Sequence, residues 1–326
     1  MTSLSELTTL RLGGPAARTV TAATAEEIVD SVAEADASGE PVLLIGGGSN
    51  LVVPDQGWPG VVVLLRSQGI DRVGDEVTVQ AGVVWDELVE TSVRNDWSGL
   101  APMSGIPGRT GATPVQNVDA YGTGVSDTIS RARVYDRETK EVAEWSPARC
   151  EFGFRTSAFK YTDRYVVLAV TFTLPSSPDA PPVRYLELAK RLGVEVGERA
   201  PSTLVRETVL GLRRGKGMVL DAEDHDTWSV GSFFINPFVP PDRVPAGCPN
   251  WPSGELVKLS AAWLIENAGF GKGYGNGRVS VSHKHSLALT NRGDGTTAEL
   301  MALAAEIADG VDAKYGIRLL PEPRIV

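Results

Sequence analysis

The stretch Pro102–Gly122, PMSGIPGRTGATPVQNVDAYG, holds four glycines and three prolines but only two charged residues. A flexible linker would be polar and repetitive. Here glycine removes side chains where a ligand must approach, and proline fixes the backbone φ angle. Gln116 and Asn117 add amide groups that both donate and accept hydrogen bonds. The composition predicts an ordered loop shaped around a ligand, with a plain tight turn as the alternative.

A second glycine loop follows a strand-like run earlier in the chain, in Leu43–Val53 (LLIGGGSNLVV). Its segment Gly46–Asn50 can direct successive backbone N–H groups at phosphate oxygens. The glycines do not match the G-x-G-x-x-G pattern of a Rossmann domain, because Leu51 takes the last position and no Asp or Glu closes a strand about 20 residues later. Two such loops beside apolar strands favour a bound dinucleotide over two separate tight turns.

Composition and charge are those of an ordinary globular enzyme. The 326 residues are 42% hydrophobic and 22% charged, with a formal net charge of -10, so two or three domains with a substantial core are possible. The negative charge argues against nucleic acid or an anionic membrane as partner, and any anion site must be local. We expect a cytoplasmic protein, because no basic start precedes an apolar run and no window reaches roughly 18 apolar residues.

Cysteine and histidine usage predicts no metal site. Cys150 and Cys248 are far apart and form no C-x-x-C pattern, so both are expected to be reduced structural thiols. The chain has three scattered histidines. In the strand expected over VSHKHSLALTN, His283 and His285 would point to one face and Lys284 to the other, which leaves too few ligands for a convincing site.

Hydrophobic periodicity predicts a small α/β unit before the central loop. The expected elements are a helix over 20–39, strands over 42–45, 61–65 and 77–80, and a helix over 83–95. Thr24 and Glu27 fit a capping box at the start of the first helix, and Gly39 can end it. Residues up to about 67 therefore alternate β, α, β and β around the first glycine loop.

After the central loop the pattern predicts an α+β arrangement with a substantial antiparallel component. The expected elements are strands over 131–135, 141–145 and 164–174, helices over 185–192 and 202–213, a helix over 260–267, a strand over 281–291 and a helix over 297–315. The proline-rich run PSSPDAPP marks an inserted segment at 175–200. Ser260 and Thr296 are the expected N-caps of the last two helices, and Gly316 closes the final one.

A basic cluster follows the predicted helix over 202–213. The run GLRRGK, which ends at Lys216, is one residue short of a Walker loop and lacks the following Ser or Thr. Arg213, Arg214 and Lys216 could simply form a solvated face, or they could supply the local anion site that the acidic chain otherwise lacks. Both interpretations stay open on composition alone.

Three further residues could carry chemistry or be structural. Ser232, in GSFFINP, sets a hydroxyl between a glycine and two aromatic residues, without the G-x-S-x-G elbow of a hydrolase. A buried turn serine is the alternative. Arg155, in FRTSAFK, could be a structural arginine in a turn, and Glu322, between two prolines, could belong to a rigid surface tail.

Six segments in this order and spacing resemble the UDP-N-acetylenolpyruvoylglucosamine reductases, the FAD enzymes of peptidoglycan precursor synthesis. They are TLRLGGPA, LIGGGSNLVV, SGIPGRTGATPVQNVDAYG, FRTSAFK, GSFFINP and PEPR. The resemblance implies an α+β fold in which two units of the vanillyl-alcohol oxidase type bind FAD and a third domain closes over the substrate. The implied divisions are 1–67 with the tail 319–326 returning to it, 68–214 with the insertion 175–200, and 215–318.

The resemblance also implies roles for individual residues. Ser232 matches the family's proton donor, and Arg155 and Glu322 match its other catalytic residues, while Tyr185, Lys216 and Asn236 match substrate contacts in the subgroup with a tyrosine loop. The implied flavin contacts, which are non-covalent, are Ile45, Gly46, Gly47, Gly48, Ser49, Asn50, Leu51, Ser104, Gly105, Ile106, Pro107, Gly108, Thr110, Gly111, Ala112, Gln116, Asn117, Gly122 and Arg213. The sequence departs from the family at Phe154, where many relatives have tyrosine, and in a tail that ends soon after Arg324.

The activity implied by the resemblance is a two-stage hydride relay. NADPH reduces FAD and leaves, the UDP-sugar enters, hydride passes to the vinyl carbon C3, and Ser232 protonates C2. Arg155 and a protonated Glu322 would stabilise the enolate-like charge. We expect a monomer with no nucleic-acid or membrane partner. The alternatives are a flavin-dependent sugar or alcohol oxidase, or a non-catalytic nucleotide-binding relative.

Overall fold

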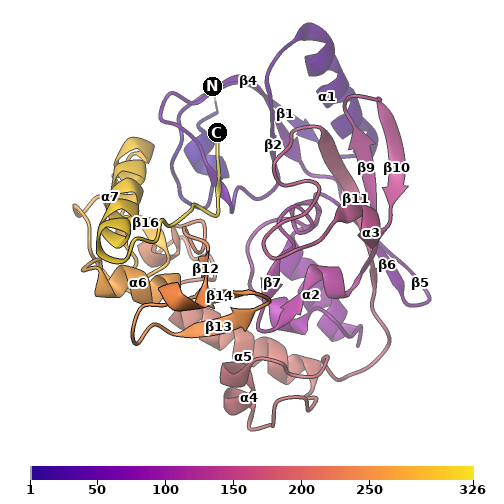
Figure 1. Ribbon diagram of the computed structural model, residues 1–326. Helices are drawn as coiled ribbons and strands as arrows, with labels where there is room; N and C mark the ends of the chain where they lie inside the picture. The colour runs from indigo at the N-terminus through magenta and orange to yellow at the C-terminus, as the bar shows by residue number, and fades with distance from the viewer. Residues whose placement is uncertain (1) are drawn as a thin grey trace. The chain divides into compact units, whose positions relative to one another are not determined.

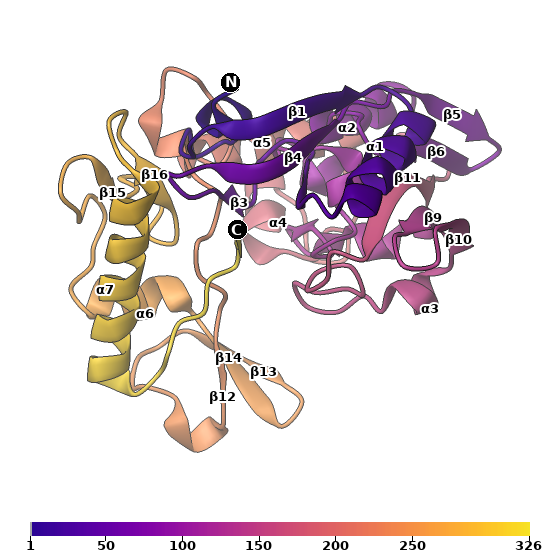
Figure 2. The same ribbon diagram turned by 90° about the horizontal axis from the view of Figure 1, so that it is seen from above.

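A computed structural model of the chain describes residues 2–326. Its internal contacts divide the chain into two compact units. The first unit comprises Ala17–Gly47 and Pro59–Arg214, and the second comprises the chain up to Ala16, Gly48–Trp58 and Gly215–Val326. The two are described in turn below (Figures 1 and 2). The division into 1–67, 68–214 and 215–318 expected from the resemblance groups the chain differently and stays a prediction.

The first unit begins with a three-stranded sheet covered by a helix. The strand order is β1-β4-β2, with β2 parallel to β4, and the elements are β1 (Ala16–Ala22), α1 (Ala25–Ser38), β2 (Val42–Ile45) and β4 (Trp58–Leu65). Ile28 and Val32 of α1 pack on Val61 and Val63 of β4 in one buried cluster. The sheet therefore ends at its carboxyl edge in the loop that follows Ile45.

A five-stranded antiparallel sheet forms the rest of this unit's β structure, in the order β10-β9-β11-β6-β5. Its strands are β5 (Ile70–Val73), β6 (Glu76–Gln80), β9 (Ile129–Asp136), β10 (Glu141–Trp145) and β11 (Tyr165–Thr173). The central strand β11, YVVLAVTFT, is almost wholly buried, which explains its continuous run of β-branched and aromatic residues. The short pair β7 (Asp119–Ala120) and β8 (Thr123–Gly124) lies in the segment just before β9.

Four helices complete the first unit's regular structure beyond α1 in Figure 1: α2 (Trp85–Arg94), α3 (Pro147–Cys150), α4 (Leu186–Leu192) and α5 (Ser202–Gly215), the last of which ends at the unit boundary. One-turn 3-10 helices lie at Ala101–Met103, Thr110–Ala112 and Val125–Asp127. Val205 and Val209 of α5 share a buried cluster with Val93 and Ala101. Helix α4 of the insertion also contributes Leu188 and Ala189 to this cluster, so α4 and α5 pack beside the start of the central glycine-rich loop.

The second unit packs α6 (Ala261–Asn267) and α7 (Thr297–Tyr315) with short strands. The strands are β3 (Leu51–Val52), β12 (Phe238–Val239), β13 (Asn250–Ser253), β14 (Leu256–Leu259), β15 (Val279–Val281), β16 (Leu289–Asn291) and β17 (Arg324–Ile325), and the 3-10 helices are Leu4–Leu7, His225–Thr227 and Pro241–Arg243. The carboxylate of Asp55 accepts the Thr297 and Ala298 amides at the N-terminus of α7, as expected for a capping anion. Segments far apart in sequence therefore build one core.

Two expected elements differ from the structure. The first helix begins at Ala25, because residues 20–22 belong to β1, although Thr24 and Gly39 cap it as predicted. The run VSHKHSLALTN is two strands separated by a loop over 282–288, so the prediction that His283 and His285 share a strand face was wrong. Among residues 2–326, no helix has the length and apolar character needed to cross a membrane.

Candidate active site

The two glycine loops expected to bind the cofactor meet inside the first unit. A Cβ atom on Gly47 would lie 2.6 Å from Cα of Gly108, and one on Gly111 would overlap Ala81. Real Cβ atoms do not approach so closely, so both contacts require glycine. The backbones of the two loops therefore lie against each other at a spacing that any other residue would open.

Most amides of the central loop are used inside the protein. The Gly105 amide donates to Oδ1 of Asp86 at 2.6 Å, Thr110 donates to the Val83 carbonyl, and Gly111 donates to the Ala81 carbonyl. By contrast, the amides of Gly47 and Gly108 donate to no acceptor within the described chain, residues 2–326. Two close backbone N–H groups in a side-chain-free cradle fit the phosphate oxygens of a dinucleotide such as FAD.

Three residues of the candidate site adopt left-handed backbone angles that side chains rarely tolerate. They are Asn117, with φ 48, Tyr121, with φ 50, and Arg155, with φ 53. Such conformations cost on the order of 1 kcal/mol or more each and tend to cluster at functional sites. The side-chain amide of Asn117 connects the central loop to two other segments. Its Nδ2 donates to the Gly153 carbonyl at 3.0 Å, and its Oδ1 accepts a hydrogen bond from the Ser126 backbone amide at 3.2 Å.

Arg155 is held from two sides in the first unit. Its guanidinium forms an ion pair with Asp119, and its carbonyl accepts the Lys160 ammonium at 2.7 Å. Its side chain keeps about a quarter of its surface exposed, at 25%. Arg155, the predicted catalytic arginine, is therefore anchored in a strained turn. This geometry is consistent both with a purely structural arginine and with a catalytic one.

Tyr185 lies beside the central loop, at the N-cap of α4. Its ring meets that of Tyr121 edge to face, with centroids 5.5 Å apart and an interplanar angle of 88°. A Cβ on Gly122 would lie 2.8 Å from Cβ of Arg184. Close packing against the insertion therefore requires a glycine at position 122, which was expected as a flavin contact. Tyr185 itself remains 43% exposed, which leaves its ring accessible to a ligand.

Arg213, another expected flavin contact, lies in the last turn of α5. Burial lowers its pKa, the Asp86 carboxylate opposes that effect, and the Arg155 charge adds to it. Asp86 is in turn gripped by Arg206 through two hydrogen bonds of 2.7 and 2.9 Å. Despite burial, Arg206 and the Gly105 amide hold the pKa of Asp86 below its usual value. Asp86 thus links α2, α5 and the central loop.

In the second unit, the segment that carries Ser232 is fixed through the next residue. The Phe233 amide donates to the Leu287 carbonyl at 2.7 Å, and the Phe233 carbonyl accepts the Glu322 amide at 2.8 Å. Glu322 is buried, at 9% exposure, so the surface-tail interpretation is wrong. Ser232 and Glu322 therefore occupy neighbouring backbone segments.

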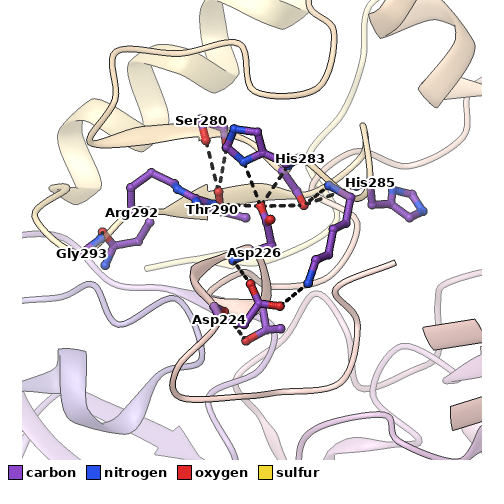
Figure 3. A network of polar contacts seen from close by, with 12 residues as sticks. Asp224, Asp226, Ser280, His283, His285, Thr290, Arg292 and Gly293 are labelled. Atoms are coloured by element: carbon purple, nitrogen blue, oxygen red, sulfur yellow. Dashed lines mark hydrogen bonds and ion pairs between the residues drawn. The ribbon is translucent and has the colours of Figure 1, made fainter. Parts of the chain in front are cut away.

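The loop that supplies the Leu287 carbonyl is organised by a buried carboxylate (Figure 3). Oδ1 of Asp226 accepts the His283 amide at 2.9 Å, Nη1 of Arg292 at 2.8 Å and the Ser282 hydroxyl at 3.2 Å. Burial disfavours the charged form, but these donors outweigh it and keep the pKa of Asp226 low. Lys284 pairs with neighbouring Asp224. His283 thus joins this network through its backbone amide and, at 3.4 Å, through Nδ1 of its ring.

The remaining expected contacts divide between the units. The first unit carries Ile45, Gly46, Gly47, Ser104, Gly105, Ile106, Pro107, Gly108, Thr110, Gly111, Ala112, Gln116, Asn117, Gly122, Tyr185, Arg155 and Arg213, and the second carries Gly48, Ser49, Asn50, Leu51, Lys216, Ser232, Asn236 and Glu322. Oδ1 of Asn236 accepts the Ala261 amide at the start of α6 at 3.0 Å, and Lys216 directly follows α5. The structure brings Ser232 together with Glu322, and Arg155 with Arg213.

Sequence reasoning missed several polar residues that organise these loops, namely Asp86, Tyr121, Arg206 and Asp226. Asp86 and Arg206 are 120 residues apart, and Asp226 and His283 are 57 apart, so no local pattern pairs them. Tyr121 stood within the glycine-rich loop, and its place before Gly122 was the one available signal.

Comparison with known proteins agrees with this geometry. Residues 16–143 match the model of the FAD binding domain family, and residues 223–326 match that of the UDP-N-acetylenolpyruvoylglucosamine reductase C-terminal domain. Among curated relatives, the UDP-N-acetylenolpyruvoylglucosamine reductase of Salinispora arenicola is 52% identical, over 99% of this chain and 94% of its own length. That of Cutibacterium acnes is 49% identical, over 99% of this chain and 89% of its own.

A solved structure shares the fold. The reductase of the same name from Thermus caldophilus aligns with a TM-score of 0.71 and 24% identity, covering 99% of this chain and 97% of its own. The fold and the glycine cradle define an FAD-dependent oxidoreductase. With about half of its residues identical over nearly the whole chain, the protein belongs to the UDP-N-acetylenolpyruvoylglucosamine reductase family.

Proposed function

We propose that the protein reduces the enolpyruvyl group of UDP-N-acetylglucosamine enolpyruvate to UDP-N-acetylmuramate, a step of peptidoglycan precursor synthesis. Family membership supports this activity, with FAD as non-covalent cofactor and NADPH as hydride donor. When bound, FAD would supply the hydride that reaches the vinyl carbon C3.

The observation that carries the proposal is the backbone hydrogen bond that joins the Ser232 segment to the Glu322 segment. Phe233 is held on its amide side by Leu287 and on its carbonyl side by Glu322, so the hydroxyl before it stands on a fixed backbone. Ser232 donates its Oγ proton to C2 of the reduced substrate. Because a serine hydroxyl is a weak acid, this fixed position matters for the short time in which the proton must transfer.

Arg155 and Glu322 stabilise the charge that develops beside the substrate carboxylate. Arg155 offers a guanidinium already held in a strained turn by Asp119, and Glu322 is buried enough to act as a protonated donor. Groups oriented before the reaction stabilise a developing anion without the reorganisation that water requires. Lys216 and Arg213 neutralise phosphate groups, while Asn236 and Tyr185 line the substrate.

The biological setting is a cytoplasmic monomer without nucleic-acid or membrane partners. The net charge of -10 supports the first of these exclusions. The three-part division into 1–67, 68–214 and 215–318 is the domain arrangement that accompanies this function.

The test replaces Ser232 with alanine and times the two half-reactions by stopped flow. Flavin bleaching with NADPH should proceed at near the parent rate, because Ser232 has no part in that step. Recolouring with the enolpyruvyl substrate should slow by roughly 10²–10⁴-fold, the usual loss for an acid catalyst. Ser232→Cys should restore part of the rate, since a thiol is the stronger acid. Normal recolouring in Ser232→Ala would exclude Ser232 as the proton donor.

A further inference from the structure

Two arginines that no sequence pattern singled out lie beside the glycine cradle of the first unit. Arg66 follows β4, and one of its Nη atoms donates to the Gly46 and Leu65 carbonyls, both at 2.8 Å. Arg109 directly follows Gly108, and its Nη1 donates to the Gly82 carbonyl. Both guanidiniums therefore hold backbone carbonyls at the edges of the two loops.

Neither guanidinium has an acidic partner. Across residues 2–326, no carboxylate lies within 4.0 Å of Arg66 or Arg109. Other partly buried arginines of this unit are paired, as Arg137 is with Asp36 and Arg206 with Asp86. Arg66 and Arg109 are partly buried, and a partly desolvated cation without a counter-charge carries a cost that a bound anion would offset.

The two charges affect one another. Burial lowers the pKa of Arg66, and the like charge of Arg109 lowers it further. Burial also lowers the pKa of Arg109, an effect that Glu87 only opposes from a distance. Both groups stay protonated at any ordinary pH. An anion bound between or beside them would relieve their mutual repulsion.

Glycines bring the backbone close to both arginines. Cβ of Arg109 lies 3.6 Å from where a Cβ on Gly46 would stand, and a Cβ on Gly82 would overlap the backbone at Arg66 and Ser67. The Gln68 amide donates to the Gly82 carbonyl at 3.1 Å, which fixes the carbonyl that Arg109 also uses. Gly46 and Gly82 therefore let the backbone approach the two arginines closely.

We infer that Arg66 and Arg109 form a phosphate clamp that binds the diphosphate of FAD, together with the amides of Gly47 and Gly108. Two fixed guanidiniums match the two negative charges of a diphosphate, and planar forks suit phosphate oxygens better than a point charge does. The inference rests on the proposed assignment of the two glycine loops as the flavin site. Phosphates of NADPH have the same chemistry, and the experiment separates the two sources.

The experiment measures FAD release from the purified holoenzyme, as recovery of free-flavin fluorescence after dilution at several NaCl concentrations. Arg66→Gln and Arg109→Gln each keep a neutral donor for the carbonyl but lose the charge. Each should weaken FAD binding by roughly 10- to 100-fold, the usual range for a charge-assisted hydrogen bond, and should flatten the dependence on salt. Arg109→Lys should recover part of both.

Arg199→Gln is the matched control. Arg199 also donates to a backbone carbonyl, that of Ala180, at 3.1 Å, and its replacement changes the net charge equally, but it lies in the insertion outside both glycine loops. It should leave FAD release and its salt dependence unchanged. Excess ADP should displace FAD from the parent and from Arg199→Gln, and should do so poorly in the two clamp variants.

Three outcomes would overturn the inference. Unchanged FAD release and salt dependence in both Gln variants would show that the clamp does not hold FAD. A raised KM for NADPH relative to NADH with normal FAD release would assign the arginines to NADPH instead. Equal losses in Arg109→Lys and Arg109→Gln would mean that the side chain is only structural. Normal FAD release in Gly47→Val would instead show that the two glycine loops do not bind FAD. This result distinguishes an error in the clamp from an error in the proposed flavin site.

Discussion

The two units position their functional loops in opposite ways. In the first unit, the loops around Gly47 and Gly111 meet because side chains are missing, and the backbones lie against Gly108 and Ala81. In the second unit, the loop before Leu287 is held by polar side chains that converge on Asp226. A cofactor bound by backbone needs space, whereas a proton donor needs a fixed direction.

This difference separates the expected effects of mutation. Changes in the two glycine loops of the first unit should alter flavin binding, because they alter the shape or charge of the cradle. Changes in the segment 215–326 of the second unit should leave flavin in place and alter substrate reduction or the local stability of the catalytic segment.

Gly111→Val should nearly abolish FAD occupancy. Its Cβ would overlap Ala81, so the loop must move, and backbone contacts to the cofactor move with it. The measurement is the ratio of flavin absorbance near 450 nm to protein absorbance in the purified protein. Gly211→Val is the control, since nothing lies within 4 Å of that position on α5. Full flavin content in Gly111→Val would show that the cradle does not depend on close packing.

Lys216→Ala should slow the second half-reaction by roughly 10- to 100-fold, the range for losing one charge-assisted contact to phosphate. Flavin content should stay complete, because Lys216 lies outside the two glycine loops. Stopped-flow traces of bleaching and recolouring separate the two stages. The neighbouring and exposed Arg214 gives the control Arg214→Ala. Equal losses in both half-reactions would indicate that Lys216 is part of a solvated face and does not bind the substrate phosphates.

Asp226→Ala should destabilise the protein by roughly 2–4 kcal/mol, because it leaves the Arg292 charge and two further buried donors without their acceptor. Thermal unfolding followed by circular dichroism measures the loss. Asp309→Ala removes a carboxylate from the exposed pair with Arg318 and should cost less than about 1 kcal/mol. If the two variants unfold at the same temperature, Asp226 does not organise this loop.

The smallest effect concerns acid stability. The Arg164 guanidinium lowers the pKa of Asp136 from 3.8 to about 2, so the ionised form stabilises the fold above the unfolded-state pKa. That contribution is lost as pH falls from about 4 to about 2. Asp136→Asn should therefore cost on the order of 1–2 kcal/mol at neutral pH and little at pH 2. FAD release at neutral pH should match the parent, because Asp136 lies outside both glycine loops, and a changed release would show that the cradle is sensitive to positions beyond those loops.

Local chemistry explains what could be predicted from the sequence. Thr24, Ser260 and Thr296 cap helices through side chains that act within three residues, so their positions follow from short patterns. The loops around Gly47 and Gly111 were also visible, because glycine is a local requirement. Their assignment to the flavin, like the roles of Ser232 and Arg155, remains a prediction.

Long-range pairing explains what could not be predicted. The sheet β12-β14-β13 has strands of two to four residues, one of which contains Pro252, so no alternation was long enough to indicate it. Asp226 depends on Ser282 and His283, more than 50 residues later. Arg66 and Arg109 are 43 residues apart in the sequence, so no local pattern indicates that their charges affect one another.

The boundary between the units has a consequence for how the protein can be divided. The chain passes from the first unit to the second between Gly47 and Gly48 and returns near Pro59, before leaving again after Arg214. During synthesis, the segment Gly48–Trp58 therefore emerges more than 150 residues before most of the core it joins. A fragment of residues 215–326 lacks the Asp55 cap of α7, so the two units cannot be exchanged between relatives as cassettes by a single splice.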